Sequence, residues 1–259
     1  MNMTSDSSTG SAILPLAGKV AAITGGSKGI GAAAVRLLAA QGARVVVGYK
    51  SGEERARKLI SEVPGDGHIV AQLALEDAAS VRRFAAETEA AFGRADILVN
   101  SAGFTVPVKH ADLDGLTDEL IDSMFISNVR GPFSVIRAFA PMLRASGSGV
   151  VVNVSSISGF SGSGSSIAYC ACKAALDTMT LSLARALGPS IRVMCVSPGA
   201  VDTDFLPGRD HTALEKIAAA TPLTRVVKPE DVADAIFACV MLKASTGGRI
   251  IVDGGRFLV

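Results

Sequence analysis

The sequence predicts an α/β fold with a single doubly wound domain, in which a seven-stranded parallel sheet carries helices on both faces. Short apolar runs rich in β-branched residues alternate with longer Ala-rich segments of helical period. No linker or repeat interrupts the alternation, and 259 residues with 49% hydrophobic side chains can bury one large core. We therefore expect one folded domain over residues 17–259, preceded by a flexible Ser/Thr/Gly-rich tail over residues 1–16.

The strands are expected where the sequence is apolar on both faces, as buried parallel strands are. These runs cover residues 20–24, 44–48, 68–75, 96–100, 150–155, 192–197 and 249–253. Segments of helical period lie between them, at residues 29–41, 52–62, 77–92, 118–144, 166–187 and 229–242. Pro229, Glu230 and Asp231 mark the start of the last helix, because proline suits the first helical position and acids suit the helix dipole. In such a fold, ligands bind at the carboxyl ends of the strands.

Charge and hydropathy exclude several classes of partner. The formal net charge is only +1, whereas nucleic acids and anionic membranes call for a concentrated basic patch. The chain has no run of about 18 apolar residues, and its first residues, MNMTSDSSTGSA, lack the basic start and apolar stretch of a targeting peptide. We expect a soluble, cytoplasmic protein that binds neither nucleic acid nor a membrane.

The cysteines and histidines give no support for a metal site. Cys170, Cys172, Cys195 and Cys239 show no C-x-x-C spacing, and the three histidines match no metal-binding motif. On a helix over residues 166–187, Cys170 and Cys172 would point about 200° apart. Tyr169 and Lys173, at positions i and i+4, would instead share one face. We therefore expect free buried thiols and no metal.

A glycine-rich turn, TGGSKGIG at residues 24–31, follows the first strand and leads into the first helix. Glycines there allow a tight turn and the close approach of a pyrophosphate, and the helix amino end supplies N–H groups. The spacing differs from the common G-x-G-x-x-G, so the position after the first strand carries the prediction. The sequence predicts a dinucleotide site at this turn, formed by Gly25, Ser27, Lys28, Gly29, Ile30 and Gly31.

The end of the second strand, VVVGYKS, indicates which dinucleotide binds. An acid there would bind the ribose 2′-hydroxyl and repel a 2′-phosphate, but positions 48–51 contain none. Next to Tyr49, the side chains of Lys50 and Ser51 can bind phosphate, and Lys28 can reach the same place. NADP(H) is the expected cofactor and NAD(H) the alternative, since the lysines can also be read as ordinary solvated side chains.

From about residue 17 to 255 the sequence closely resembles the short-chain dehydrogenase/reductase family. Seven motifs occur in the family's order, namely TGGSKGIG, NSAG, NVRG, NVSS, YCACK, SPG followed by a threonine, and VDGG. The resemblance implies a catalytic tetrad of Asn128, Ser156, Tyr169 and Lys173. Ser156 is chosen over Ser155 because it precedes Tyr169 by 13 residues, the separation familiar in the family. The cofactor contacts that the resemblance implies are Asn100, Ala102, Gly103, Pro198, Gly199, Val201 and Thr203.

The sequence departs from the family pattern after the third strand. Where the family usually has an aspartate that contacts the adenine, this chain has Ala74. Adenine binding would then depend on backbone groups around Leu75, or on a different register that uses Glu76 or Asp77. The change from Asn-Asn-Ala-Gly to NSAG is milder, because the leading asparagine and the Ala-Gly pair remain.

Tyrosine and lysine at this spacing suit carbonyl reduction, which needs a hydride from the nicotinamide and a proton for the alkoxide. A free tyrosine has a pKa near 10, and a cation about 4 to 6 Å away lowers such a pKa by roughly 1 to 3 units. Tyr169 is the expected acid and Lys173 the cation. Ser156 would hydrogen-bond the substrate oxygen. The resemblance adds a role for Lys173 on the nicotinamide ribose and for Asn128 on a water that passes protons to it.

Each of these side chains has a simpler interpretation. A buried tyrosine with a bonded hydroxyl is common, Lys173 could be a plain surface residue, and the serines could merely end a strand. The combination of the 13- and 4-residue separations with a dinucleotide fold favours the catalytic interpretation.

The segment at residues 202–225 follows the sixth strand and is expected to act as a substrate loop over the cofactor. It offers an apolar wall and groups for an anion, although it can equally be a solvated helix face. The candidates are Phe205, Leu206 and Leu214 for the wall, Arg209, His211 and Lys216 for the anion, and Phe104, Val106 and Phe160 elsewhere.

The expected function is an NADPH-dependent reductase of a ketone or 3-oxoacyl thioester, resembling 3-oxoacyl-acyl-carrier-protein reductases. The alternative is an NAD(P)-dependent sugar or secondary-alcohol dehydrogenase, and a dinucleotide sensor without turnover ranks below both. Because family members are commonly homotetramers that pair long helices and carboxyl-terminal strands, we also expect a homotetramer. The segments at 118–144 and 166–187 and the apolar ending RFLV fit that assembly.

Overall fold

The computed structural model describes residues 14–206, 208 and 211–259. Within these residues, seven parallel strands form one sheet in the order β3-β2-β1-β4-β5-β6-β7, which confirms the predicted fold class. The chain starts in the middle of the sheet, moves to the β3 edge and then crosses to the β7 edge. The strands are β1 (Val20–Thr24), β2 (Arg44–Tyr49), β3 (Ile69–Gln72), β4 (Ile97–Asn100), β5 (Gly149–Val154), β6 (Ile191–Pro198) and β7 (Arg249–Val252).

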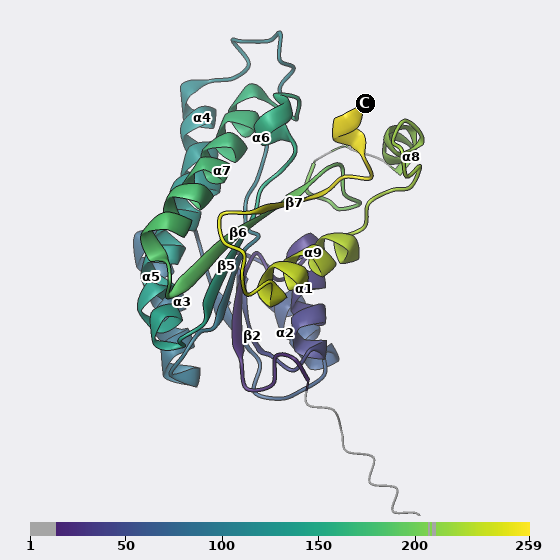
Figure 1. Ribbon diagram of the computed structural model, residues 1–259. Helices are drawn as coiled ribbons and strands as arrows, with labels where there is room; N and C mark the ends of the chain where they lie inside the picture. Colours follow the sequence, from purple (N-terminus) through teal and green to yellow (C-terminus); the bar gives the residue numbers. More distant parts are fainter. Residues whose placement is uncertain (1–13, 207, 209–210) are drawn as a thin grey trace, which may run out of the picture.

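Helices cover both faces of the sheet (Figure 1). One face carries α1 (Gly29–Ala40), α2 (Glu53–Glu62) and α9 (Pro229–Met241). The other carries α3 (Ala78–Phe92), α5 (Gly131–Ala145) and α7 (Ile167–Leu187), with α4 (Asp118–Phe125) against α7. The short helices α6 (Ser158–Ser161) and α8 (His211–Ala219) lie near the carboxyl-terminal 3-10 turn η2 (Arg256–Leu258), at the top of Figure 1.

Most of the core consists of two apolar layers separated by the sheet, and a smaller cluster surrounds Met124 and Tyr169. Alternate residues of a strand point to opposite faces, so Ala21 and Ile23 of β1 belong to one layer and Val20 and Ala22 to the other. All four side chains are fully buried, as expected for a central parallel strand. Burying a large apolar side chain contributes roughly 1.5 to 3 kcal/mol, which makes these two layers the main source of stability.

The segment predicted as one helix over residues 118–144 is divided by a π-helical turn, Ile126–Arg130. Pro132 follows this turn and has no N–H to donate to the carbonyl four residues earlier, at Asn128. The Asn128 side chain also donates to the backbone oxygen of Met124 at 2.9 Å. Both features disturb the regular ladder, and a one-turn bulge results.

The predicted strand over residues 68–75 is shorter in the structure, where β3 ends at Gln72. Leu73 still donates to the backbone oxygen of Tyr49, after which the chain leaves the sheet. The domain also begins earlier than residue 17, because Leu16 is buried and its N–H donates to the Gln41 oxygen at 2.9 Å. Residues 1–13 of the expected tail lie outside the described residues.

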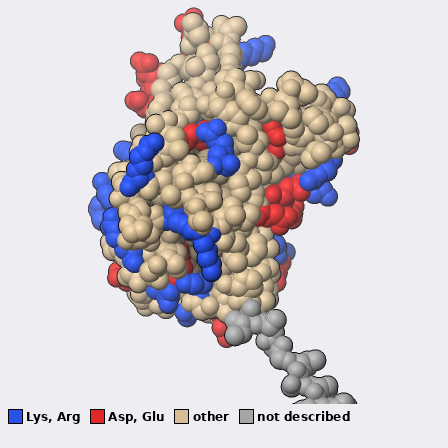
Figure 2. Space-filling view, in the orientation of Figure 1, with Lys and Arg blue, Asp and Glu red and all other residues tan. Residues whose placement is uncertain are grey.

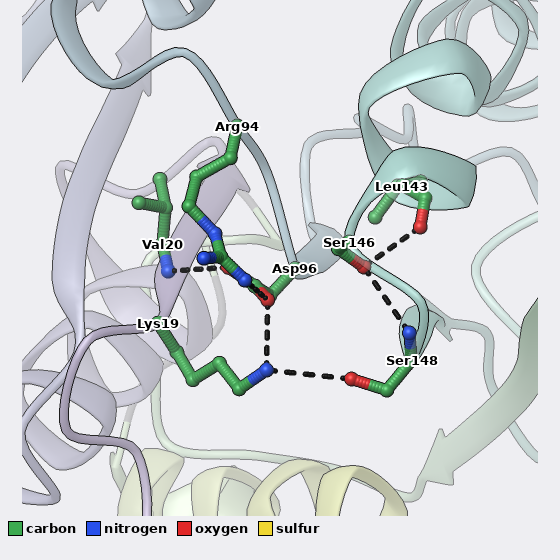
Figure 3. A network of polar contacts seen from close by, with 7 residues as sticks. All are labelled: Lys19, Val20, Arg94, Asp96, Leu143, Ser146 and Ser148. Carbon is green, nitrogen blue, oxygen red and sulfur yellow. Dashed lines mark hydrogen bonds and ion pairs between the residues drawn. The ribbon is translucent and has the colours of Figure 1, made fainter.

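A polar network ties the amino ends of the central strands together (Figure 3). Asp96, just before β4, accepts hydrogen bonds from the Val20 N–H, Lys19 and Arg94 at 2.6 to 3.0 Å. Burial would raise the pKa of Asp96, but the bonds from Arg94, Lys19 and Val20 outweigh it and hold the pKa below its usual value. Lys19 also reaches Ser148 before β5. This end of the sheet is therefore fixed by structural contacts, opposite the end that ligands use.

Charged side chains of both signs are distributed among uncharged surface on the face shown in Figure 2. Among the described residues, no helix is both long and apolar enough to cross a membrane.

Candidate active site

A cavity of about 1530 Å³, called the main cavity below, lies at the carboxyl ends of the strands. Residues that follow β1 to β6 line it, as the position of ligand sites in doubly wound folds predicts. It also receives residues of α1, α2, α6, α7 and the end of the chain. Of the predicted site residues, it is lined by Gly25, Ser27, Lys28, Gly29, Ile30, Tyr49, Lys50, Ser51, Leu75, Ala102, Gly103, Ser156, Tyr169, Lys173, Pro198, Gly199, Val201 and Thr203.

Three predicted residues stand behind the cavity wall. A Cβ atom at Gly31 would overlap the carbonyl oxygen of Gly25, so this glycine lets α1 begin directly against the turn. Asn100 is buried, and its amide donates to the Asn153 side chain at 2.9 Å. Asn128 is also buried, at 1% exposure. These three therefore support the wall and do not line it.

The start of α1 has unsatisfied donors that fit a pyrophosphate. Lys28 occupies the N-cap position in extended conformation, and its side chain makes no capping hydrogen bond. The first N–H groups of a helix lack partners within the helix and carry partial positive charge. Since Lys28, Gly29 and Ile30 all line the main cavity, the residues present fit the phosphates of a dinucleotide.

Tyr169 and Lys173 lie one turn apart on α7, and both line the main cavity. The N-cap residue Ser166 accepts a hydrogen bond from the Tyr169 N–H at 3.2 Å, which fixes the first turn. The Lys173 Nζ atom lies 5.6 Å from the centroid of the Tyr169 ring and donates to the Val154 oxygen at 2.9 Å. The i, i+4 spacing therefore brings both side chains to one face, as the sequence predicts.

Burial sets the protonation of Lys173, which is 6% exposed. Loss of hydration lowers the pKa of Lys173 to about 8, and this effect outweighs the opposing influence of Cys195, Cys172 and Asp177. The lysine therefore carries its positive charge up to about pH 8. Below that pH, a buried cation lies 5.6 Å from the centroid of the Tyr169 ring.

The two serines after β5 differ in their contacts. Ser155 donates to the backbone oxygen of Lys173 at 3.3 Å, which ties the strand end to α7. Ser156 accepts from the Ser158 N–H at 3.1 Å and makes only a long contact, 3.5 Å, with the Pro198 oxygen. Both line the main cavity, but the Ser156 hydroxyl has the weaker protein acceptor and the greater freedom to turn toward a ligand.

The π-helical turn positions Asn128. Its amide group donates to the backbone oxygens of Phe104 and Met124, both at 2.9 Å. Its Oδ1 atom is buried and has no hydrogen-bond partner among the described residues. A Cβ atom at Gly103 would lie 2.5 Å from this oxygen, so only glycine at that position avoids a clash with Oδ1. A buried acceptor of this kind is suited to hold a water molecule.

At the opposite end of the main cavity, two of the predicted nucleotide contacts are already engaged. Lys50 forms an ion pair with Glu76, and its hydrogen bond holds the pKa of Glu76 below its usual value. Burial, followed by a hydrogen bond to Glu53, raises the pKa of Tyr49. The predicted phosphate ligand Lys50 thus has an acidic neighbour, Glu76, from the segment that follows β3.

The turn after β3 answers the question raised by Ala74. The Ala74 N–H donates to Ser80 at 2.9 Å and Ala74 does not line the cavity, whereas Leu75 and Glu76 do. Asp77 caps α3 by accepting from the Ala79 N–H at 2.7 Å. Leu75 and Glu76 thus border the cavity, with Glu76 paired to Lys50, and Asp77 is a structural cap.

Aromatic side chains surround the catalytic end of the main cavity. Phe104, Phe160 and Phe205 line it as predicted, together with Phe257, which the sequence analysis assigned only to an apolar chain end. The Phe205 ring lies 5.9 Å from the Tyr169 ring, and Phe160 and Phe257 meet edge to face at 4.7 Å. Leu206 lines the cavity as well. The cavity wall thus carries four aromatic rings, of which that of Phe205 lies beside Tyr169.

Other residues of the predicted substrate loop lie elsewhere. Val106 and Lys216 do not line the main cavity, and Leu214 is buried on the inner side of α8. Arg209 and the His211 side chain lie outside the described residues. An amphipathic helix such as α8 gives no signal in its sequence for which neighbour its apolar side will face, which explains the error for Leu214.

The cysteines are buried free thiols in the structure. Burial raises the pKa of Cys172 to about 11 and that of Cys195 to about 12, so neither forms a thiolate near neutral pH. Within the described part of the chain, no group of three or more His, Cys, Asp or Glu side chains is arranged to hold a metal ion.

Comparison with known proteins identifies the family. The model of a family described as enoyl-(acyl carrier protein) reductase matches residues 25–256, nearly the whole folded domain. The chain belongs to the short-chain dehydrogenase/reductase family. The resemblance noted in the sequence is thereby confirmed over the same part of the chain.

Two relatives and one solved structure illustrate the range of this short-chain dehydrogenase/reductase family. A protein named as a ketoacyl reductase of the granaticin polyketide synthase of Streptomyces violaceoruber is 38% identical over 93% of this chain and 96% of its own. L-rhamnose 1-dehydrogenase (NAD(P)(+)) of Azotobacter vinelandii is 35% identical over 93% and 97%. A dehydrogenase/reductase structure from Sinorhizobium meliloti 1021 superposes with a TM-score of 0.83, at 33% identity over 94% and 97% of the two chains.

As a short-chain dehydrogenase/reductase, the protein is an oxidoreductase that acts on hydroxyl or carbonyl groups and uses a nicotinamide nucleotide. The relatives are named for different substrates, so membership alone leaves the substrate and the choice of nucleotide to the chemistry of the site.

Proposed function

We propose that the protein is an NADPH-dependent reductase of a ketone or 3-oxoacyl thioester, with Tyr169 as the general acid. The observation that carries this proposal is the placement of Tyr169 and Lys173 on one face of α7, at the apolar end of the main cavity. A ketone needs a proton donor beside its oxygen and an apolar wall beside its substituents, and this end of the cavity offers both.

In this mechanism, NADPH supplies the hydride that the carbonyl carbon accepts. Tyr169 gives its hydroxyl proton to the carbonyl oxygen, so the substrate becomes an alcohol and the tyrosine becomes a tyrosinate. The charged Lys173 nearby stabilises that anion. Ser156 donates a hydrogen bond to the same substrate oxygen while negative charge develops on it.

A water molecule held by Asn128 would return a proton to Tyr169 after each reduction. In this proposal the free Oδ1 atom of Asn128 holds the water molecule, through which a proton reaches Lys173 and then Tyr169. The reduced pKa of Lys173, about 8, favours such exchange near neutral pH, because a proton is passed most readily by a group whose pKa is close to the working pH.

The preference for NADPH rests on charge at the end of β2. Positions 48–51 contain no acid, and Ser27, Lys28 and Ser51 line the cavity there as donors for a 2′-phosphate. Glu76 also lines this end, but its charge is paired with Lys50 and repels a phosphate less than a free carboxylate would.

The name of one relative favours a second candidate, an NAD(P)-dependent sugar or secondary-alcohol dehydrogenase, since the rhamnose dehydrogenase matches nearly as well as the ketoacyl reductase. The same residues would act in reverse, with tyrosinate as the base. A sugar substrate is less favoured, because aromatic side chains that line the cavity offer few hydrogen bonds to its hydroxyl groups. These are Phe104, Phe160, Phe205 and Phe257.

The experiment is a panel of substrates with the purified protein, in which loss of the reduced nicotinamide absorbance is followed with NADPH and with NADH. The panel contains acetoacetyl thioester, small 3-oxoesters, open-chain and cyclic ketones, an enoyl thioester, and alcohols with NADP⁺. Faster turnover of a ketone or 3-oxo compound with NADPH supports the proposal. Turnover of the enoyl thioester alone, or of alcohols alone, would replace it, and NADPH binding without any turnover would favour a dinucleotide sensor.

We further propose a cytoplasmic homotetramer. Unpaired buried thiols suit a reducing compartment. Exposed apolar side chains lie on two separate parts of the surface, with Phe133 and Leu181 on α5 and α7, and Met241 and Ile251 on α9 and β7. Two different self-complementary patches are what a tetramer with 222 symmetry needs. Light scattering at micromolar concentration should give four times the chain mass, and a monomer mass would refute this assembly.

A further inference from the structure

Arg55 brings a guanidinium to the nucleotide end of the main cavity, where the sequence suggested Lys28, Lys50 and Ser51 as phosphate ligands. It lies in the first turn of α2, after the end of β2, and lines the cavity together with Ser27, Ser51 and Gly52. Arg36 of α1 lines the same end. Four basic side chains, those of Lys28, Arg36, Lys50 and Arg55, therefore compete for the role of phosphate ligand.

Ion pairing separates these four. Arg36 is held by Glu62 at 2.9 Å, and Lys50 is paired with Glu76. Among the described residues, no acidic side chain forms an ion pair with Arg55 or Lys28. A cation whose charge is already balanced gains less from a new anion than an unpaired one. The charge available to a phosphate thus comes from Arg55 and Lys28.

The first acid of α2, Glu53, is also balanced by a basic neighbour. Glu53 accepts from Arg57 at 2.7 Å, and the hydrogen bonds from Arg57 and then Tyr49 hold its pKa below its usual value. Its carboxylate therefore stays ionised, but Arg57 offsets the repulsion that it would exert on a phosphate nearby.

Glycine at position 52 lets Arg55 and Ser27 lie close together. A Cβ atom at Gly52 would lie 3.1 Å from Nη2 of Arg55 and 3.2 Å from Oγ of Ser27. The guanidinium and the hydroxyl thus lie close together beside Gly52, on the wall of the main cavity. A guanidinium presents parallel N–H groups that match two phosphate oxygens, and a serine hydroxyl can donate to a third.

We propose that Arg55 and Ser27, with Lys28, bind the 2′-phosphate of NADP(H), and that Lys50 is held back from it by Glu76. This assignment rests on the proposed preference for NADPH and names the residues that produce it. Of these three residues, Arg55 determines the preference for NADPH over NADH, because in this proposal it contacts only the 2′-phosphate and neither the pyrophosphate nor the adenine.

The test measures binding alone, so that it does not depend on finding a substrate. The dissociation constants of 2′,5′-ADP and 5′-AMP are measured by calorimetry, and those of NADPH and NADH by nicotinamide fluorescence, at constant ionic strength. In Arg55→Ala, we expect 2′,5′-ADP and NADPH to bind roughly 10- to 100-fold more weakly, as loss of a charged hydrogen bond predicts. Binding of 5′-AMP and NADH should change by less than about twofold, and Arg55→Lys should recover part of the loss.

Arg36→Ala is the matched control, since Arg36 lines the same end of the cavity but is paired with Glu62. It and Lys50→Ala should each weaken 2′,5′-ADP binding less than Arg55→Ala does. Unchanged binding of 2′,5′-ADP in Arg55→Ala, equal losses for 5′-AMP, or a larger loss in Lys50→Ala would overturn the assignment. If the unaltered protein binds 5′-AMP as tightly as 2′,5′-ADP, the NADPH preference itself fails, and the assignment with it.

Discussion

The ammonium nitrogen of Lys173 lies 5.6 Å from the centroid of the Tyr169 ring, inside the protein, with the Val154 oxygen as its hydrogen-bond acceptor. The site therefore keeps a positive charge where hydration is lost, which lowers the pKa of Lys173 from 10.5 to about 8. Burying this charge lowers the free energy of unfolding of the protein. The charge lies beside Tyr169, the proposed general acid.

The lowered pKa of Lys173 predicts that the difference in stability between the unaltered protein and Lys173→Met depends on pH. Between pH 8 and 10.5 the unfolded lysine binds a proton that the folded one has lost, so the unfolded state binds more protons. The stability of the unaltered protein relative to Lys173→Met should therefore rise with pH, by up to about 1.4 kcal/mol per pH unit. Below pH 8 the lysine is charged in both states, and the difference should be constant.

Urea unfolding of both proteins at half-unit steps from pH 7 to 9.5 measures this difference. If the free energies of unfolding differ by the same amount throughout, Lys173 is not the buried cation with lowered pKa described above.

Tyr49→Asp should move the cofactor preference toward NADH. Tyr49 ends β2 and lines the nucleotide end of the main cavity. An aspartate there would repel the 2′-phosphate and could accept a hydrogen bond from the ribose 2′-hydroxyl. We expect the ratio of kcat/KM for NADPH to that for NADH to fall at least about tenfold, a change of roughly 1.4 kcal/mol in discrimination.

Tyr49→Phe is the control, because it removes the hydroxyl that bonds to Glu53 without adding charge. It should keep the original preference. An unaltered ratio in Tyr49→Asp would show that the end of β2 does not read the 2′-position.

Phe257→Ala should raise KM for large substrates and leave KM for small substrates unchanged, because of the place of the Phe257 ring in the cavity wall. Its ring closes the apolar wall by packing edge to face on Phe160, which in turn lies under the Arg249 guanidinium at 4.4 Å. Loss of this ring should raise KM for a bulky apolar ketone roughly 5- to 10-fold, the value of one aromatic contact of about 1 to 1.5 kcal/mol. KM for a ketone too small to reach the wall should stay the same.

Leu258→Ala serves as the comparison, because Leu258 is 78% exposed and does not line the cavity. Equal changes in the two variants, or equal effects of Phe257→Ala on large and small ketones, would remove Phe257 from the substrate wall.

The sequence pattern was sufficient to predict the sheet and its covering helices, because a buried parallel strand must be apolar on both faces and each helix must present one apolar side. The glycine turn and the Tyr169–Lys173 spacing are also local features, so their placement follows once the adjoining helices are known. The π-helical turn at Ile126–Arg130 could have been anticipated from Pro132 inside a long helical segment.

The remaining features depend on contacts between distant segments. Lys50 meets Glu76 only because β2 and β3 are neighbours in the sheet. Phe257 enters the cavity because Asp253 accepts from its N–H at 2.7 Å and turns the chain back. Neither pairing leaves a periodic signal in the sequence, so the sequence predicted no partner for Lys50 and assigned Phe257 to an apolar chain end that fits a subunit contact.

The most direct test of the account is turnover by Tyr169→Phe, measured with NADPH and the best ketone of the panel, alongside NADPH binding by fluorescence. The account predicts that the dissociation constant of NADPH stays within about threefold while kcat falls roughly 10²- to 10⁴-fold, the usual value of a positioned proton donor. A variant that binds NADPH and retains more than about a tenth of the original kcat would contradict the assignment of Tyr169 as the general acid.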